Sequence, residues 1–194
     1  VNVDCHAVLV RPRGGLSVRP PGVHAQSVLR HPVDKIRHVD AQELRLVDWM
    51  TVEQEVIDDF GRSTKDLDWM HIDPVRASRE GPYGGTIAFG FWSLSMLTYF
   101  SHQIGMWPKD VAYGLNYGLE KVRWLNPVRV GCRIRQRCTL TDLERRDDGY
   151  VSIRTTNVLE IEGEERPALI ADWLGLFVQE NSDSGFRSQE KDRE

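Results

Sequence analysis

The stretch TIAFGFWSLSMLTYFSHQI, residues 86–104, decides the fold. At helical spacing its apolar side chains point in nearly every direction, and only small or polar residues such as Ser93, Thr98 and Gln103 interrupt them. A helix that is apolar nearly all round has to be enclosed by other structure. The stretch only reaches the lower length limit of a membrane span, about 18 residues, and its polar residues favour a water-soluble core. We therefore predict a long helix that the rest of the domain buries.

The chain that follows this helix has the pattern of an antiparallel sheet. Apolar and polar residues alternate along residues 151–161 and again along residues 133–140. Residues 147–149 (DDG) would form the turn between these strands, and residues 162–165 (EGEE) the next turn. Residues 168–178, ALIADWLGLFV, are almost all apolar, as in a central strand. The order predicts an α+β domain in which an antiparallel meander wraps the buried helix.

Length and composition indicate one domain with loose ends. The chain has 194 residues and a mass of 22.3 kDa, which suits a single core. Residues 1–42 contain RPRGG and RPPG without sustained periodicity, so we expect a flexible N-terminal extension, part of which need not belong to the functional protein. Residues 181–194 are expected to form a disordered C-terminal tail. The folded domain is therefore predicted to span residues 43–180.

Charge and cysteine content argue against several classes of protein. The net charge is −4, and since residues 1–40 carry +3, the remainder carries −7. The acidic remainder argues against nucleic-acid binding. Only the basic residues 1–40 leave that function possible. Three cysteines cannot form a complete disulfide framework, so a reducing compartment is the simpler inference. Since no signal-type or membrane-spanning segment is recognised, we expect a cytoplasmic protein without membrane contact.

Two helix signals flank the segment that carries the candidate chemistry. Thr51 and Gln54 form a capping-box signature, which predicts a helix over residues 52–60 that ends at Gly61. Further along, Asp73-Pro74 reads as the N-cap and first position of another helix, because the aspartate oxygen accepts from an orphan N–H and proline needs no donor there. The residues between these two helices are therefore expected to form a turn.

Asp66 and His71 lie within that turn, on either side of the apolar Trp69 and Met70. On an ideal helix they would point about 140° apart, at roughly 100° per residue, so they converge only if the segment is a turn. Beside an apolar wall, an Asp–His pair can have its proton affinities tuned for acid–base catalysis. The alternative is ordinary surface and capping chemistry, which this short pattern by itself favours.

Three glycines, Gly84, Gly85 and Gly90, lie at or near the start of the predicted buried helix. Free N–H groups and the positive end of the helix dipole can stabilise a developing oxyanion at such a place. The alternative is structural, since glycines let a helix approach a sheet closely. The pattern alone leaves both possibilities open.

In combination, these motifs resemble the signature of the MaoC-like dehydratases, the family of (R)-specific enoyl-CoA hydratases with a hot-dog fold. The resemblance covers roughly residues 43–180 and implies a single hot-dog domain. The matching positions are Asp66, Met70-His71, Asp73-Pro74, Ala77, GGTIAFGF at residues 84–91 and LNYGLEKVRWLNPVRVG at residues 115–131.

The resemblance implies roles for three residues. Asp66 matches the catalytic aspartate and His71 the catalytic histidine, which jointly hold the water that adds to C3 of a trans-2-enoyl thioester while a proton is delivered to C2. Gly90 matches the glycine whose backbone N–H polarises the thioester carbonyl. The implied reaction is hydration of enoyl-CoA or an acyl-carrier-protein thioester to the 3-hydroxyacyl thioester, or the reverse dehydration, in a homodimer. Coenzyme A belongs to the substrate, and no cofactor or metal is expected.

Four positions depart from the family pattern. Lys65 replaces the glycine before the aspartate, Asp68 an asparagine, Trp69 a proline and Phe89 the histidine of the family's A-H-G. A second carboxylate at Asp68 would either raise a neighbouring pKa or point to solvent. Phe89 removes a polar group beside the oxyanion position, which would alter substrate fit without abolishing the chemistry.

Two other functions remain open at this stage. A hot-dog thioesterase would hold the same acyl thioester but direct water to the carbonyl carbon, and an inactive relative would only bind it. The remaining histidines show no metal-ligand spacing. Arg133, Arg135 and Arg137 are expected on a solvated strand face, with contact to a coenzyme A phosphate as the alternative. Acyl chain length, the kind of carrier and the physiological direction stay undetermined.

Overall fold

The structure is a computed structural model that describes residues 42–44, 46–105, 111–146 and 149–179. Apart from Gln42, the predicted extension at residues 1–42 lies outside the described residues, and so does the predicted tail at residues 181–194. The structural statements below concern the described ranges.

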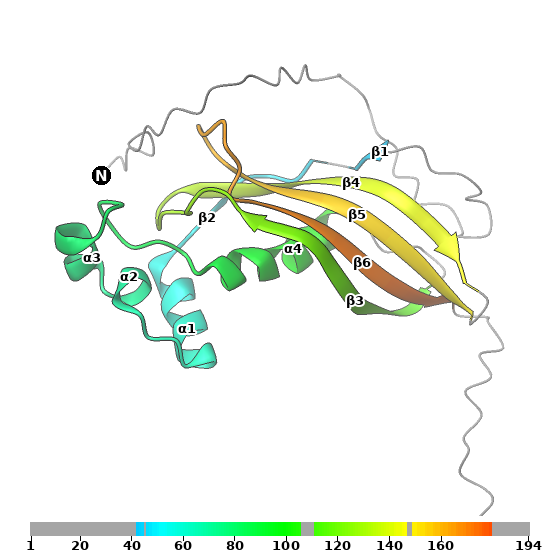
Figure 1. Cartoon of the computed structure of the whole chain (residues 1–194), viewed down its shortest axis with the longest axis horizontal. Coiled ribbons are helices and arrows are strands. Elements are labelled where there is room, and N and C mark those ends of the chain that lie inside the picture. Colours follow the sequence, from blue (N-terminus) through cyan, green and yellow to red (C-terminus); the bar gives the residue numbers. More distant parts are fainter. Residues whose placement is uncertain (1–41, 45, 106–110, 147–148, 180–194) are drawn as a thin grey trace, which may run out of the picture.

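Four long antiparallel strands form the body of the molecule. The sheet order is β1-β4-β5-β6-β3, and the short β2 also pairs with β4. Figure 1 shows the sheet curling over helix α4, so the predicted α+β architecture, a sheet wrapped around a helix, is confirmed. The strands are β1 (Gln42–Glu43), β2 (Met50–Thr51), β3 (Val111–Trp124), β4 (Arg133–Arg145), β5 (Tyr150–Ile161) and β6 (Leu169–Gln179).

The strand predictions hold where the structure describes them. Side chains of β5 alternate between buried and half-buried along the whole strand, because one face of the sheet packs on α4. The near-continuous apolar run became β6, which lies between β5 and β3 as an interior strand. Gly163 has φ 81° in the predicted turn at residues 162–165. In the other predicted turn, Asp147 and Asp148 lie outside the described residues.

Helix α4 (Gly90–Ile104) begins four residues later than predicted. The preceding residues are extended, since Ala88 N–H donates to the carbonyl of Val128 at 2.7 Å and the backbone N–H of Val130 donates to the carbonyl of Thr86 at 3.0 Å. No helix in the described ranges is long and apolar enough to cross a bilayer.

The expected enclosure of this helix is only half realised. On the side toward the sheet, Trp92, Leu97 and Phe100 are buried. On the other side, Phe91 is 71% and Tyr99 45% exposed. The predicted central helix wrapped by the sheet is therefore confirmed, and the sheet of one chain covers one side of this helix.

Three short helices, α1 (Gln54–Thr64), α2 (Trp69–Ile72) and α3 (Pro74–Glu80), gather at one end of the molecule (Figure 1). The predicted cap of α3 is confirmed, since Asp73 accepts from the N–H of Arg76 at 2.9 Å. The predicted capping box of α1 is wrong: Glu53 is the N-cap and makes no side-chain cap bond.

The predicted end of α1 is also wrong. Gly61 lies inside this helix and is buried, and α1 ends at Lys65, which has φ 64°. Only glycine adopts this left-handed conformation without steric cost. The left-handed backbone at Lys65 therefore explains why the family pattern has a glycine at this position.

The arginines of β4 pair with carboxylates across the sheet. Arg133 bonds Glu162 at 2.9 Å, Arg135 bonds Glu160 at 2.8 Å, and Arg137 pairs with Glu160 as well. These side chains are partly exposed, so each pair contributes little to stability. The arrangement fits the predicted solvated strand face and gives the guanidinium groups partners within the chain.

Candidate functional site

His71 lies in the single-turn helix α2, at the end of the molecule where the three short helices meet. Asp68 begins this turn, because its Oδ1 accepts from the backbone N–H of Met70 at 2.8 Å. Asp68 therefore acts as a helix cap, which is a structural role for the residue that replaces the family's asparagine. His71 was expected on a turn just before α3, and it occupies a helical turn in that place.

The imidazole of His71 has a defined orientation. Its Nδ1 lies 2.7 Å from the backbone carbonyl oxygen of Ile87. Because a carbonyl can only accept, Nδ1 carries the hydrogen, and Nε2 of the neutral ring is left with its lone pair. A general base needs such a nitrogen, so this contact prepares His71 to take up a proton.

Phe89 supports the imidazole from one side. The two ring centroids are 3.9 Å apart, and Phe60 of α1 lies 5.3 Å from Phe89 on the other side. Gly61 makes room for this cluster, since an added Cβ there would lie 3.1 Å from Cζ of Phe89 and 2.8 Å from the carbonyl oxygen of Asp66. Phe89 is 4% exposed, so the departure from the family's histidine places an apolar ring beneath the candidate base.

His71 and Gly90 line one cavity of about 290 Å³. Trp124, Val128 and Ala168 form part of its apolar wall. Gly90 is the first residue of α4, so its backbone N–H has no acceptor one turn earlier in the helix. The positive end of the helix dipole lies at the same place. The cavity therefore combines a proton acceptor with a site that favours negative charge.

Trp124 covers the start of α4. Its indole Nε1 donates to the carbonyl oxygen of Gly90 at 2.8 Å. A Cβ added to Gly90 would lie only 3.0 Å from this Nε1. Glycine at this position therefore permits the close approach of the indole, in agreement with the structural alternative, and it also leaves the helix start open to the cavity.

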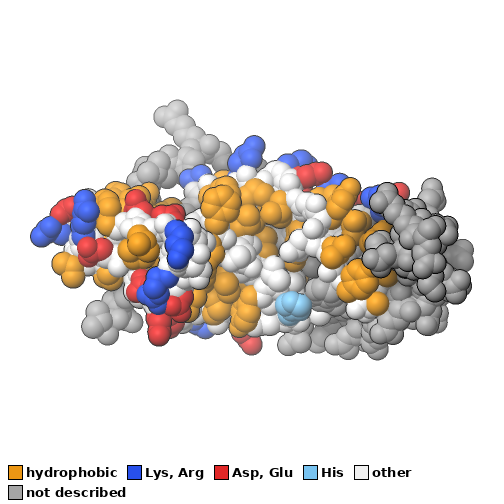
Figure 2. Space-filling view, turned by 90° about the horizontal axis from the view of Figure 1, so that it is seen from below, with side chains coloured by type: hydrophobic (Ala, Val, Ile, Leu, Met, Phe, Trp, Pro, Cys, Tyr) orange, Lys and Arg blue, Asp and Glu red, His pale blue; other side chains and the backbone are white. Residues whose placement is uncertain are grey.

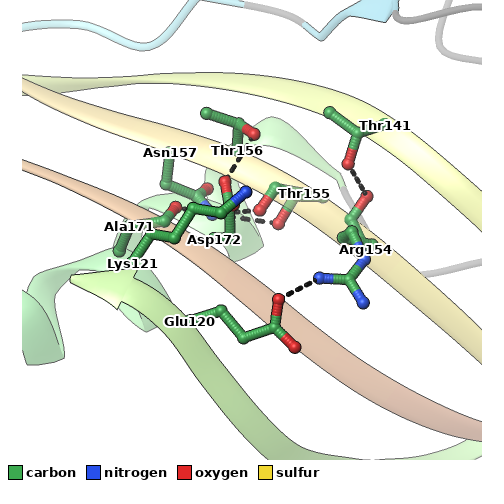
Figure 3. A network of polar contacts seen from close by, with 9 residues as sticks. All are labelled: Glu120, Lys121, Thr141, Arg154, Thr155, Thr156, Asn157, Ala171 and Asp172. Atoms are coloured by element: carbon green, nitrogen blue, oxygen red, sulfur yellow. Dashed lines mark hydrogen bonds and ion pairs between the residues drawn. The ribbon is translucent and has the colours of Figure 1, made fainter.

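A bulge in β3 precedes Trp124. The register with β6 shifts between Glu120 and Arg123, and Lys121 within the bulge has φ 49°. Figure 3 shows Lys121 beside Asp172 of β6, at 3.4 Å, and Asp172 also accepts from Thr156 at 2.7 Å. Bulges re-aim the side chains that follow them. This one precedes the strand end from which the indole reaches α4.

Asp66 lies in the connection between α1 and α2, and its side chain is exposed. Its Oδ1 accepts from the backbone N–H of Asp68 at 3.3 Å. Within the described ranges no hydrogen bond joins Asp66 to His71, and Asp66 is not among the residues that line the cavity. The structure thus brings His71 and Gly90 to one cavity and leaves the Asp66 carboxylate exposed at the surface.

Sequence reasoning missed two residues of the site. Gln54 was interpreted as part of a capping box, yet its side chain bonds His71 and Thr86. Trp124 carries no local signal, because its partner Gly90 is 34 residues away in the chain. Only the T-x-x-Q spacing pointed to Gln54, and it pointed to a different role.

Metal ligands were also considered. Within the described ranges, no three or more His, Cys, Asp or Glu side chains are grouped as a metal site requires. The expectation of a site without metal or cofactor stays a prediction.

Residues 37–161 match the family described as "MaoC like domain". The chain belongs to this family. The resemblance predicted from the sequence is therefore confirmed, and with it the assignment to a family of dehydratases and hydratases. The roles of Asp66, His71 and Gly90 in this MaoC-like chain stay predictions, which the geometry above makes specific.

Known relatives agree with this assignment. The chain is 41% identical over 144 residues to Nodulation protein N of Rhizobium leguminosarum bv. viciae, covering 73% of this chain and 88% of that protein. It is 40% identical over 131 residues to 3-hydroxyacyl-thioester dehydratase Z of Mycobacterium tuberculosis, covering 68% and 85%. The (R)-hydratase from A. caviae involved in PHA biosynthesis superposes with a TM-score of 0.58 at 15% identity, over 72% of this chain and 97% of that one. This structure confirms the hot-dog fold.

Proposed function

We propose that this MaoC-like protein hydrates trans-2-enoyl thioesters, such as enoyl-CoA, to (R)-3-hydroxyacyl thioesters, or catalyses the reverse dehydration. The observation that carries the proposal is the shared cavity: the lone pair of His71 Nε2 and the N-terminus of α4 at Gly90 belong to one space of about 290 Å³. A relative at 40% identity is named 3-hydroxyacyl-thioester dehydratase Z, which supports the same reaction class.

In this proposal the helix start polarises the thioester. The carbonyl oxygen of the substrate accepts from the backbone N–H of Gly90, where the helix dipole adds positive potential. Attack of water at C3 moves the C2–C3 π electrons onto that oxygen and produces an enolate. Donors aimed at such a developing charge in a site sheltered from water stabilise the transition state more than the ground state.

His71 and Asp66 supply the proton chemistry. The attacking water donates one hydrogen bond to Nε2 of His71 and a second to the Asp66 carboxylate. As the C3–O bond forms, the dyad takes up one proton of the water, and this proton then passes to C2 as the enolate collapses. The exposed Asp66 carboxylate must reach the same water. The Asp66 carbonyl oxygen and the Phe89 ring both pack close to Gly61, within 2.8 and 3.1 Å of where its Cβ would lie.

We further propose that a second copy of the chain completes the molecule. β3 is the last strand in the sheet order, so its outer edge is unpaired within the described ranges. Figure 2, which views the underside, shows hydrophobic side chains gathered across the middle of the molecule. Phe91 of α4 and Tyr117 and Leu119 of β3 are exposed and line a hollow of about 380 Å³. An exposed apolar patch beside an unpaired strand edge suits an isologous dimer, in which two copies pair through the same surface.

The experiment is a hydration assay on the purified protein. We expect loss of enoyl-thioester absorbance with short or medium trans-2-enoyl-CoA and formation of the (R)-3-hydroxyacyl product. His71→Ala and Asp66→Asn, each shown to be folded by circular dichroism, should lose this activity by about 100-fold or more, the usual contribution of an acid–base group.

Three other results would contradict the proposal. Release of free thiol would identify a thioesterase. Binding without either product would identify an inactive acyl-thioester-binding relative. Hydration that survives in folded His71→Ala would place the chemistry on other residues.

A further inference from the structure

We infer that Gln54 is a positioning residue for His71, an inference that rests on the proposed function and deepens it. The Gln54 side chain connects two segments that are distant in sequence. Its Nε2 donates to the backbone carbonyl oxygen of His71 at 2.8 Å, and its Oε1 accepts from the hydroxyl of Thr86 at 2.5 Å. These two contacts, here called the Gln54 bridge, link α1 to the turn that carries His71 and to the extended segment before α4.

The Gln54 bridge holds both partners of the hydrogen bond that orients the imidazole. His71 Nδ1 donates to the carbonyl of Ile87 at 2.7 Å, and Ile87 follows Thr86 directly in the chain. The backbone N–H of Ile87 donates in turn to the carbonyl of Met70 at 3.1 Å. The Gln54 side chain therefore anchors the backbone of His71 and also the segment whose Ile87 carbonyl accepts the hydrogen bond from the His71 ring.

The pattern of donors and acceptors requires an amide at this position. Nε2 has a second partner, the Asp58 carboxylate one turn along α1 at 2.7 Å, so both amide hydrogens are used. Both partners of Nε2 can only accept, which fixes the orientation of the amide. A glutamate of the same size would lose both donors and place a carboxylate against the His71 carbonyl and against Asp58. It would therefore push α2 away from α1.

The test compares Gln54→Glu with Glu55→Gln, the reverse exchange at the exposed next residue of the same helix. With trans-2-enoyl-CoA as substrate, Gln54→Glu should lower kcat by about 10- to 100-fold with little change in KM, because a catalytic group displaced by about 1 Å can cost on that order. Glu55→Gln should keep the parent value. A folded Gln54→Glu variant with the parent's kcat would overturn the inference, and so would an equal loss in Glu55→Gln.

Thr86→Val tests the second anchor, since valine keeps the shape of threonine and removes its hydroxyl. A glutamate at position 54 would still accept from Thr86, so the cycle uses Gln54→Met, which removes the acceptor as well. If both side chains act through one bridge, the double variant Gln54→Met/Thr86→Val should have a kcat close to that of the less active single variant. Losses that multiply would mean that the two residues act independently, and would contradict a shared bridge.

A second readout does not depend on activity. Nitrogen NMR of the imidazole, assigned by comparison with His71→Ala, reports which ring nitrogen carries the hydrogen. In mildly alkaline buffer we expect hydrogen on Nδ1 of His71 in the parent and a mixture of both tautomers in Gln54→Glu. An unchanged tautomer overturns the inference at any kcat. If the parent hydrates no enoyl thioester and the tautomer still changes, the proposed function fails while the positioning role of Gln54 stands.

Discussion

The two sides of helix α4 both carry aromatic side chains, and these have opposite surroundings. Toward the sheet, Trp92, Leu97 and Phe100 are at most 4% exposed. On the other side, Phe91 and Tyr99 are 71% and 45% exposed. The apolar residues of a helix therefore predict how much of its surface has to be buried. They do not predict which part of the structure buries it. In this molecule the sheet of the same chain covers one side, and the other side stays exposed.

The candidate site lies where these two sides meet. Gly90 starts the helix, and the groups that orient the site are paired within one chain, as the contacts of His71 with Ile87 and of Trp124 with Gly90 show. The hollow lined by Phe91 and Leu119 is open to the exposed side. The two candidate groups that share the cavity, His71 and Gly90, thus belong to one chain, while the apolar surface next to them stays exposed. Substitutions can therefore address the covered side, the exposed side or the start of the helix, where the two sides meet.

The largest effect is expected from Gly90→Ala, at the point where both sides meet. The new Cβ would crowd Trp124 and occupy the cavity at the helix start, 3.0 Å from the indole Nε1. We expect kcat/KM to fall by about 100-fold, because the methyl group would keep the thioester oxygen away from the backbone N–H, which the substitution itself retains. Stability should change by only about 1 kcal/mol, because the half-exposed indole can move.

Gly85→Ala is the matched control for this change. An added Cβ at Gly85 meets no atom within 4 Å, and Gly85 has no positive φ. The control should keep the parent's activity in the steady-state assay. Equal losses in the two variants would show that Gly90 has no special relation to the cavity.

Leu119→Lys addresses the exposed side alone. In a monomer this substitution changes little, since Leu119 is already 46% exposed. In a dimer it would bury a charge against the apolar hollow, so we expect self-association to weaken by at least about tenfold. Light scattering across a concentration series measures this. Val75→Lys, on the 77% exposed Val75 of α3, should leave association unchanged, and a parent that is monomeric throughout would contradict the assembly.

The Cys138 thiol reports whether water reaches the face of the sheet that packs on α4. Burial raises the pKa of its thiol to about 12 from 9.0, and hydrogen bonds with Thr155 and Gln136 offset only part of this shift. A pKa raised by folding stabilises the native state fully below pH 9.0, and this contribution is lost as the pH rises toward about 12. The loss should approach about 1.4 kcal/mol per pH unit within that window.

Urea unfolding of the parent and of Cys138→Ala measures this contribution. The parent should be more stable at pH 8, because alanine leaves a small cavity, and the difference should shrink as the pH rises above 9.0. A difference that stays constant up to pH 11 would show that the covered side of the sheet admits water.

The smallest effect is expected from Trp124→Phe, which keeps an aromatic ring beside α4 and removes the indole N–H. The lost hydrogen bond to the Gly90 carbonyl should lower the free energy of unfolding by about 1 kcal/mol. Trp124→Leu should lower it further, because the ring contact with Phe91 is lost as well. A Trp124→Phe variant as stable as the parent in urea unfolding would mean that the indole hydrogen bond contributes nothing, and equal values for Trp124→Phe and Trp124→Leu would mean the same of the ring contact.

Much of the fold could be predicted from local patterns. The alternation along β5 and the apolar run of β6 follow from which face of each strand is covered, and one sequence shows such periodicity directly. Boundaries were less accurate. The chain before Gly90 is apolar enough for a helix, yet the Ala88 N–H donates to Val128 and the Thr86 carbonyl accepts from Val130, contacts that no local pattern reveals.

The site divides in the same way. His71 and Gly90 were recognisable because their motifs have a characteristic spacing, and the structure brings both to one cavity. The Gln54 bridge was not recognisable, since it depends on bonds to residues 17 and 32 positions away. A T-x-x-Q spacing is equally compatible with a helix cap, and only the packing of α1 against α2 distinguishes the two roles.

By itself, the sequence of this protein determined its family, its α+β class and the residue types available for acid–base chemistry. These follow from short-range spacing and from how much apolar surface the chain must bury. Only the tertiary structure decided that His71 faces the start of α4, that Phe89 supports its ring, and that one side of α4 stays uncovered. Such features arise from contacts between distant segments, whose geometry depends on the packing of the whole domain.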